Sequence, residues 1–288
     1  MDVVSVRGVY ADAQSFPAGL TRRGLKSPAD ERSAALAGTG QLRALVVIPT
    51  YNEAANIQTV INRILGLQNE AIEILIVDDN SPDGTGQVVA NWSENEPRLH
   101  LLRRPGKMGL GTAYVDGFRY ALQHGYDAIF EMDADLSHSP EDLPRLLEKI
   151  EDYDLVIGSR YLQGGVNVIN WPLSRLLLSL FANWYTRTIT GMPIHDCTSG
   201  FKCIHRRVLH SVCLDEIASN GYAFQIELHY KIWRQGSRIC EIPIVFTERR
   251  QGKSKMSGKV QFEAATMVWR LKIQDWLGKI RSAGAAVN

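Results

Sequence analysis

The sequence lacks the patterns that would place it in several common functional classes. Its seven histidines show neither HExxH nor zinc-finger spacing, and its four cysteines form no CxxC pair. This use of cysteine indicates a reduced, cytosolic protein with buried thiols rather than a disulfide framework or a zinc site. The formal net charge of only +1 excludes a protein that is held to nucleic acid by its overall charge.

Long apolar runs are also missing. No window of about eighteen apolar residues is free of charge, and the most apolar stretch, which begins at Trp171, contains Arg175 and Arg187. Charged residues such as Asp2 and Arg7 interrupt the N-terminal segment, where a secretion signal would need an apolar core. We therefore expect neither a membrane-spanning helix nor secretion.

Short β-rich runs alternate with helical segments over most of the 288 residues. Such alternation predicts an α/β fold with a mostly parallel, helix-covered sheet. We divide the chain into a disordered extension over residues 1–40, one folded domain over 41–260, and an amphipathic helix with a tail over 261–288. The expected strands are 44–48, 72–79, 99–102, 128–133 and 154–159, and the expected helices are 54–66, 84–94, 112–124 and 140–150.

Three polar clusters fall where expected strands end, at residues 49–53, 78–80 and 133–135. In open α/β sheets, ligands bind beyond the carboxyl ends of the strands. The clusters should therefore converge on one crevice.

Asp133 and Asp135 would place two hard oxygen donors near one Mg²⁺ or Mn²⁺ ion that bridges a diphosphate. By themselves the two aspartates favour a plain strand end, because acidic residues often close strands, and Asp79 is equally compatible with a solvated turn. The presence of all three clusters favours a site, in which Asp79 would hydrogen-bond a ribose or a base edge.

Basic residues point to an anionic partner. From Leu155 through His195 the chain has no Asp or Glu, whereas Arg160 and Arg175 remain. An apolar stripe at helical spacing runs over 173–184, with Arg175 and Ser179 on a neighbouring face. This segment is either a core helix or a helix at a membrane surface whose polar side faces a phosphate.

Three further segments each allow two interpretations. Residues 106–114 fit neither GxGxxG nor GxxxxGK[ST], so they are a flexible loop over a nucleotide or a simple turn. Residues 248–259 are a solvated basic loop or a mobile flap that closes on phosphates. The apolar stripe over 262–280 packs on the domain or anchors the protein at an interface, and its tryptophans favour the anchor.

The motifs, taken together and in order, resemble family-two glycosyltransferases of the dolichyl-phosphate (polyprenyl-phosphate) mannosyltransferase group. This resemblance implies a Rossmann-like glycosyltransferase-A domain over 41–260 with helices on both faces of the sheet, a nucleotide-sugar donor, Mg²⁺ or Mn²⁺, and inversion at the anomeric carbon. The motifs are "VVIPTYNEAANI", "ILIVDDNSPDGT", "GLGTAYVDGFRYAL", "MDADLSHSPEDLPRL", "VIGSRY", "TSGFK", "GYAFQIEL" and "ERRQGKSKMSG".

The resemblance also implies roles for individual residues. For catalysis it implies Asp133, Asp135 and Arg160; for the metal it implies Asp133 and Asp135, with Ser137 where some relatives have a glutamine. For the acceptor phosphate it implies Arg160, Arg175 and Ser179. For the donor it implies Pro49, Tyr51, Glu53, Val77, Asp79, Asp133, Ala134, Asp135, Arg249 and Lys255.

The implied reaction is transfer of mannose from GDP-mannose to a polyprenyl phosphate. The implied setting is the cytoplasmic face of a membrane, where the protein binds peripherally, with a membrane-embedded partner as one option and no nucleic acid. Two alternatives stay open: a relative that transfers glucose or another sugar from a UDP-sugar, and a non-catalytic adaptor that binds lipid or nucleotide. A processive polysaccharide synthase is disfavoured because a QxxRW motif is absent.

Overall fold

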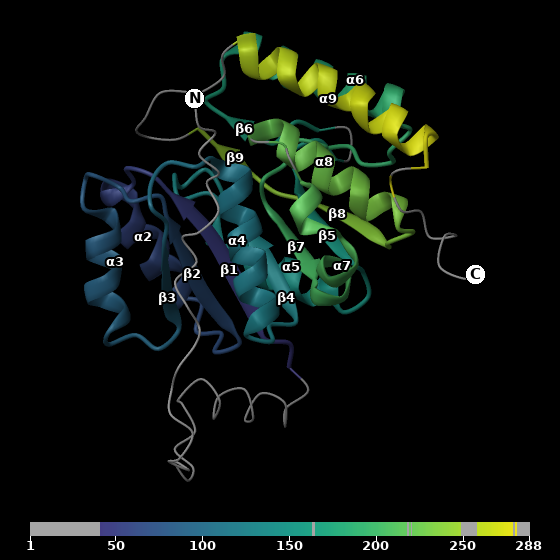
Figure 1. The fold of residues 1–288 in the computed structure, drawn as a ribbon. Coiled ribbons are helices and arrows are strands. Elements are labelled where there is room, and N and C mark those ends of the chain that lie inside the picture. Colours follow the sequence, from purple (N-terminus) through teal and green to yellow (C-terminus); the bar gives the residue numbers. More distant parts are fainter. Residues whose placement is uncertain are drawn as a thin grey trace, which may run out of the picture.

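A seven-stranded sheet forms the centre of the molecule (Figure 1). The computed structural model describes residues 41–162, 165–217, 219, 221–248, 258–278 and 280, so the expected extension over 1–40 lies outside the described residues. The strand order is β3-β2-β1-β4-β7-β5-β8. The strands are β1 (Ala44–Thr50), β2 (Ile72–Asp78), β3 (Leu99–Arg103), β4 (Ala128–Glu131), β5 (Leu155–Ser159), β7 (Lys202–His205) and β8 (Ile239–Pro243).

The sheet is mostly parallel, as the alternating pattern predicted. Strands β1 to β4 pair in parallel, and β5 pairs in parallel with β8. The strand β7 runs antiparallel between β4 and β5, and it was not expected from the sequence. All seven residues of β2 are buried, which is typical of a central strand that is covered on both faces.

Helices cover both faces of the sheet because successive strand residues point to opposite sides. Leu45 and Val47 of β1 face one apolar cluster, whereas Val46 and Ile48 face the other. The main helices are α2 (Ala54–Leu65), α3 (Thr85–Ser93), α4 (Leu110–Gln123), α5 (Leu143–Ile150), α7 (Arg206–Ser211) and α8 (Gly221–Arg234).

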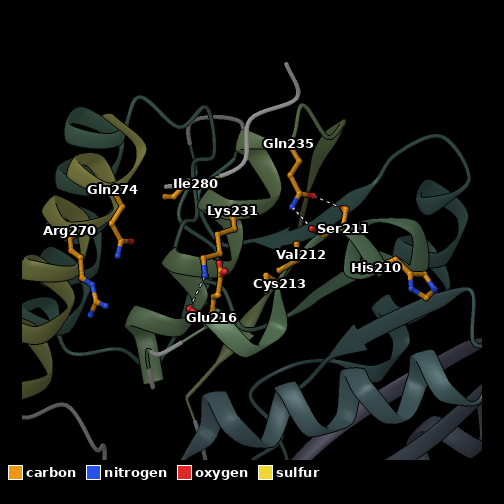
Figure 2. Close-up of a pocket in the computed structure, with 10 residues that line it drawn as sticks. All are labelled: His210, Ser211, Val212, Cys213, Glu216, Lys231, Gln235, Arg270, Gln274 and Ile280. Atoms are coloured by element: carbon orange, nitrogen blue, oxygen red, sulfur yellow. Dashed lines mark hydrogen bonds between the residues drawn. The ribbon is translucent and has the colours of Figure 1, made fainter. Parts of the chain in front are cut away.

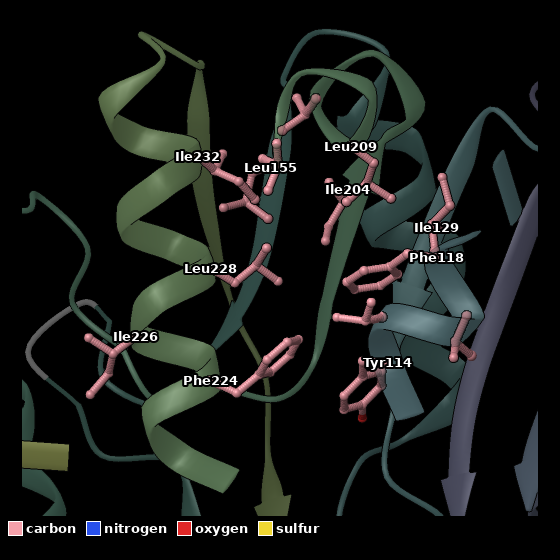
Figure 3. Close-up of a cluster of buried hydrophobic side chains, with 14 of the residues drawn as sticks. Tyr114, Phe118, Ile129, Leu155, Ile204, Leu209, Phe224, Ile226, Leu228 and Ile232 are labelled. Carbon is pink, nitrogen blue, oxygen red and sulfur yellow. The ribbon is translucent and has the colours of Figure 1, made fainter. Parts of the chain in front are cut away.

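The first cluster lies between the sheet, α4 and α8 (Figure 3). Tyr114 of α4 stacks on Phe224 of α8 with ring centroids 5.8 Å apart. Helix α4 also approaches β1 closely at Gly117, where an added Cβ would lie 2.3 Å from Val47 Cγ1. Only glycine fits at this contact, so the sequence of α4 determines how near the helix lies to the strand.

Two long helices pack against each other at one end of the molecule (Figure 1). They are α6 (Leu173–Thr190) and α9 (Gly258–Trp276), and the Tyr185 hydroxyl donates a hydrogen bond to the Ala265 carbonyl at 3.2 Å. Beside α6 lies a two-stranded parallel sheet, β6 (Val168–Ile169) with β9 (Phe246–Thr247). Within the described part of the chain, no helix is long and apolar enough to cross a membrane.

Candidate active site

The three strand-end clusters line one cavity of about 290 Å³. It lies beyond the carboxyl ends of β1, β2 and β4, where the sequence analysis expected a crevice. Arg160, at the end of β5, and Arg175, on α6, line the same cavity. Among the predicted site residues, those on its wall are Pro49, Tyr51, Glu53, Asp79, Asp133, Ala134, Asp135, Arg160 and Arg175.

The loop that follows β4 holds its two aspartates with contacts from nearby groups. The Asp133 amide donates to His138 Nδ1 at 3.3 Å, and the Ser137 amide donates to Asp135 Oδ1 at 3.0 Å. Leu136 has φ of 62°, a left-handed conformation that is costly for a side chain of this size. Such backbone strain is common at binding sites.

The donor set suits a hard divalent cation that shares its coordination with phosphates. Asp133 and Asp135 supply two carboxylates, and the part of the chain that the structure describes contains no cluster of three His, Cys, Asp or Glu side chains arranged for a metal. Mg²⁺ is usually held by one or two carboxylates together with substrate phosphates and water. The residues therefore fit Mg²⁺ or Mn²⁺ that arrives with a diphosphate.

A neutral histidine lies directly under this loop. His138 lines the cavity, is 2% exposed and stacks on Phe201 with centroids 5.0 Å apart. Burial lowers the pKa of His138 to about 4, although the charge of Asp135 opposes the shift. At neutral pH the ring is uncharged, so Nδ1 can accept the hydrogen bond from Asp133.

Below the cavity, a buried ion pair ties β4, β7 and α8 together. Lys202 Nζ lies 3.1 Å from Glu131 Oε2 and also donates to the side-chain carbonyl of Gln225. Gln225, which lines the cavity, donates to Glu131 Oε2 at 2.8 Å. Burial raises the pKa of Glu131 and lowers that of Lys202, while the attraction between the two charges opposes both shifts. We assigned no role to these residues from the sequence, although "TSGFK" and "GYAFQIEL" contain Lys202 and Gln225.

The glycine-rich loop borders the part of the cavity that contains Asp79. Asp79 Oδ1 lies 3.0 Å from the Arg104 guanidinium, and Oδ2 accepts a hydrogen bond from the Met108 amide at 3.2 Å. Lys107 Nζ lies 4.4 Å from the centre of the Tyr51 ring. Because Lys107 and Tyr51 both line the cavity, this loop forms part of its wall and is more than a connecting turn.

The two arginines are paired with acids that lie outside the acid-free segment. Arg160 forms two hydrogen bonds to Asp196, at 2.7 and 2.6 Å, and Arg175 forms one to Glu248 at 2.8 Å. The Arg175 guanidinium also lies 4.2 Å from the centre of the Trp171 ring. Sequence analysis missed these partners because they come from distant segments.

Several predicted site residues lie off the cavity wall. Val77 is fully buried in the first apolar cluster, and Ser137 is 2% exposed and contacts Asp135 through its backbone. The Ser179 hydroxyl accepts a hydrogen bond from Tyr161 at 2.7 Å. Ser137 thus holds the Asp135 carboxylate through its amide and is not among the residues that line the cavity. Arg249 and Lys255, the predicted flap residues, lie outside the described residues.

A larger cavity of about 570 Å³ lies elsewhere, beside α7, α8 and α9 (Figure 2). Several of its polar side chains are already paired, as in the hydrogen bonds of Ser211 with Gln235 and of Lys231 with the Glu216 carbonyl. It contains none of the strand-end clusters. We therefore place the chemistry in the cavity with the aspartates.

Comparison with known proteins decides the family. The model of the family "Glycosyl transferase family 2" matches residues 45–213, more than half of the chain. The chain belongs to this family. It is therefore a glycosyltransferase enzyme with a glycosyltransferase-A, Rossmann-like fold.

Two curated relatives match this glycosyltransferase over most of its length. An undecaprenyl-phosphate mannosyltransferase of Micrococcus luteus is 44% identical over 80% of this chain and 93% of its own. A polyprenol monophosphomannose synthase of Mycolicibacterium smegmatis is 45% identical over 81% of this chain and 86% of its own.

A solved structure supports the fold independently. The mannosyl-3-phosphoglycerate synthase of Rubrobacter xylanophilus superposes with a TM-score of 0.58 and 18% identity, and the match covers 88% of this chain and 81% of the other. At this level of identity, the likeness concerns the fold alone.

Proposed function

We propose that this glycosyltransferase transfers mannose from GDP-mannose to a polyprenyl monophosphate, with inversion at the anomeric carbon. One observation carries the proposal: a single cavity is lined by the paired carboxylates Asp133 and Asp135, by Asp79, and by the arginines Arg160 and Arg175. The names of the two relatives that are 44% and 45% identical support both the sugar and the acceptor class.

The donor diphosphate would lie against Asp133 and Asp135. These carboxylates would hold Mg²⁺ or Mn²⁺, which when bound neutralises the charge that develops on the leaving diphosphate. The Ser137 amide and the neutral His138 ring keep the loop in place from the protein side. The protein thus holds the groups that bind the diphosphate in fixed positions, and such positioning and electrostatic stabilisation are the usual basis of catalysis of group transfer.

The acceptor would need no dedicated base. A phosphate monoester has a second pKa of about 6, so at neutral pH it is already largely a dianionic nucleophile. Arg160 and Arg175 would hold this anion behind the anomeric carbon. A phosphate oxygen of the acceptor then forms a bond to the anomeric carbon. On the opposite face, the bond between this carbon and the diphosphate of GDP breaks, which inverts the configuration and releases GDP.

Asp79 supports guanine as the donor base. Its carboxylate is nearly buried, lines the cavity and has fixed neighbours in Arg104 and the Met108 amide. A carboxylate can accept two hydrogen bonds from the adjacent N–H and NH₂ groups of guanine, whereas uracil offers a single N–H at its edge. The uracil of a UDP-sugar would therefore form one hydrogen bond with Asp79 where guanine forms two.

A donor and acceptor panel tests the proposal. Purified protein with Mg²⁺, labelled GDP-mannose and a short polyprenyl phosphate is expected to form a labelled lipid, whereas UDP-glucose and UDP-N-acetylglucosamine are expected to give little product. Efficient transfer from a UDP-sugar with none from GDP-mannose would replace the donor assignment. Donor binding without turnover of any nucleotide sugar would favour the adaptor alternative.

A further inference from the structure

The two arginines on the cavity wall are held by their acids in different ways. Arg160 donates to both carboxylate oxygens of Asp196, and the two side chains are 6% and 0% exposed. Arg175 makes one contact with Glu248, and these side chains are 15% and 31% exposed. A buried, two-pronged pair is costly to separate, whereas a partly solvated single contact contributes little net stability. In the Arg175–Glu248 pair, another anion could therefore replace the Glu248 carboxylate at little cost.

Arg175 has a second support that does not depend on Glu248. Its guanidinium lies 4.2 Å from the centre of the Trp171 ring, and Trp171 packs edge-on against Phe246 with centroids 5.4 Å apart. The Arg160 guanidinium lies 5.5 Å from the same indole ring. Trp171 would thus keep Arg175 beside Arg160 when the carboxylate of Glu248 moves away.

The backbone around Glu248 connects it to both halves of the site. Its amide donates to the Ile169 carbonyl at 3.1 Å, next to the β6–β9 pair. The preceding residue, Thr247, donates to the Ser137 carbonyl at 3.2 Å, in the loop that carries the two aspartates. The segment formed by β9 and Glu248 therefore places the Glu248 carboxylate beside Arg175 and also contacts the loop that carries Asp133 and Asp135.

We propose that Glu248 is an internal counter-anion of Arg175, and that the phosphate of the acceptor displaces it on binding. The proposal rests on the acceptor class proposed above. In the free protein the carboxylate neutralises Arg175. When the dianionic phosphate binds, it replaces one negative charge with two, and the carboxylate rotates towards solvent. Glu248 then competes with the bound phosphate, which favours release of the monoanionic phosphodiester product.

This role predicts that a substitution in the binding site strengthens phosphate binding, whereas most substitutions in a binding site weaken it. Glu248→Gln removes both the competing charge and its repulsion of the incoming phosphate, while Trp171 still holds Arg175. Phosphate monoesters should then bind more tightly, by about two- to fivefold, the range expected for loss of one partly exposed pair. A purely structural role of Glu248 predicts the opposite, because Arg175 would lose its orientation.

Calorimetric titration at pH 7.5 with farnesyl phosphate, a soluble phosphate monoester, provides the test. Inorganic phosphate is titrated in parallel to separate recognition of the phosphate from recognition of the lipid. The variants are Glu248→Gln, Arg175→Gln and the double variant, and Glu151→Gln serves as a matched loss of charge on the exposed end of α5. Among the single variants we expect tighter binding in Glu248→Gln only, and a clearly smaller effect of Glu248→Gln in the Arg175→Gln background, where only its direct repulsion of the phosphate is left to remove.

Each outcome bears on the proposal. Unchanged or weaker phosphate binding by Glu248→Gln, in a variant that unfolds at the wild-type temperature, overturns it. GDP is titrated with the same variants, and an equal tightening of GDP by Glu248→Gln also overturns the proposal, because Arg175 would then serve the donor. Wild-type protein that binds neither phosphate refutes the acceptor assignment and this proposal with it. Tighter phosphate binding in a protein that makes no mannolipid leaves the exchange intact and refutes only the reaction proposed above.

Discussion

Asp135 is the side chain whose replacement tests the proposed chemistry most directly. It is 8% exposed, lines the cavity and accepts a hydrogen bond from the Ser137 amide. Asp135→Asn keeps the size of the side chain but removes the charge that would hold a divalent cation. Neutralisation of a leaving diphosphate by a metal is worth several kcal/mol, so kcat/KM for mannose transfer should fall by about 10³-fold. A labelled GDP-mannose assay measures this loss.

The control for Asp135 is Asp152→Asn, an exposed aspartate in the turn after α5. It should retain wild-type activity. Both variants should keep the wild-type unfolding temperature and circular dichroism, so that the lost activity is not a lost fold. If Asp135→Asn kept more than about a tenth of the activity, Asp135 would not hold the metal.

At the residue scale, the sequence located the carboxylates and arginines that line the cavity, whereas some other predicted site residues lie off its wall. Asp133 and Asp135 follow a strand directly, so their place beyond its carboxyl end is a local property. Ser137 is 2% exposed and is not among the residues that line the cavity. The resemblance named Ser137 by its position in the motif, and a position in a motif does not reveal which way a loop side chain packs.

At the scale of elements, a buried network of side chains links β1, β2, β3 and β4 near their first residues. Glu73 of β2 accepts hydrogen bonds from Arg43 at 3.1 Å and from Tyr126 at 2.7 Å, and it lies 2.8 Å from His100 of β3. Burial alone would raise the pKa of Glu73, but the hydrogen bonds from His100, Tyr126 and Arg43 lower it to about 2. The network therefore holds the sheet together through a charged carboxylate.

Glu73→Gln should lower the free energy of unfolding by about 3 kcal/mol at pH 7, because Arg43 loses its buried partner. The folded-state pKa of Glu73 is depressed to about 2, so its contribution is fully present above the unfolded-state pKa of about 4.3. It is lost as pH falls from there towards 2. The difference between wild type and variant should therefore be constant above about pH 5 and shrink below it. Urea unfolding over a pH series measures this.

Glu70→Gln is the matched control for Glu73. The Glu70 side chain is 64% exposed and lies 3.7 Å from Arg98, so its loss should change stability by less than about 1 kcal/mol. A Glu73→Gln difference that is the same at pH 3 and pH 7 would show that the charge of Glu73 is not what stabilises the sheet.

The first half of the chain was easier to predict than the second half. The runs that became β1 to β5 are strongly apolar and alternate with helical segments, and each was recognised within a few residues. Strand β7 has only four residues, of which Lys202 and His205 are polar. Its antiparallel place between β4 and β5 depends on non-local pairing with Phe130 and Val156, which a local pattern does not reveal.

At the scale of the whole molecule, the adjacent helices α6 and α9 expose large apolar side chains. Trp184 is 61% exposed and Trp276 is 85% exposed. Other exposed apolar residues on these helices include Leu173, Leu177, Leu180, Phe181, Trp269 and Ile273. Exposed tryptophans on amphipathic helices are typical of proteins that lie at a membrane interface. This supports the expectation from the sequence that the protein binds peripherally to a membrane, and we propose that α6 and α9 are the docking helices.

Trp184→Ser and Trp276→Ser should each weaken binding to phosphatidylcholine–phosphatidylglycerol vesicles by about fivefold, because each removes roughly 1 kcal/mol of apolar transfer. Vesicle sedimentation measures the bound fraction. Met108→Ser removes a side chain that is 52% exposed but lies on the glycine-rich loop, and it should bind vesicles as wild type does. Equal losses in all three variants, or none in the tryptophan variants, would contradict docking through α6 and α9.

The sequence by itself determined the alternation of strands and helices, the carboxylates and arginines of the site, and the resemblance to family-two glycosyltransferases. These properties depend on short-range periods and on motifs that are contiguous in the chain. Only the tertiary structure decided how the arginines are neutralised, because Asp196 and Glu248 reach Arg160 and Arg175 from segments 36 and 73 residues away. Partners at such separations are set by which segments the fold brings together, and that is a property of packing rather than of local pattern.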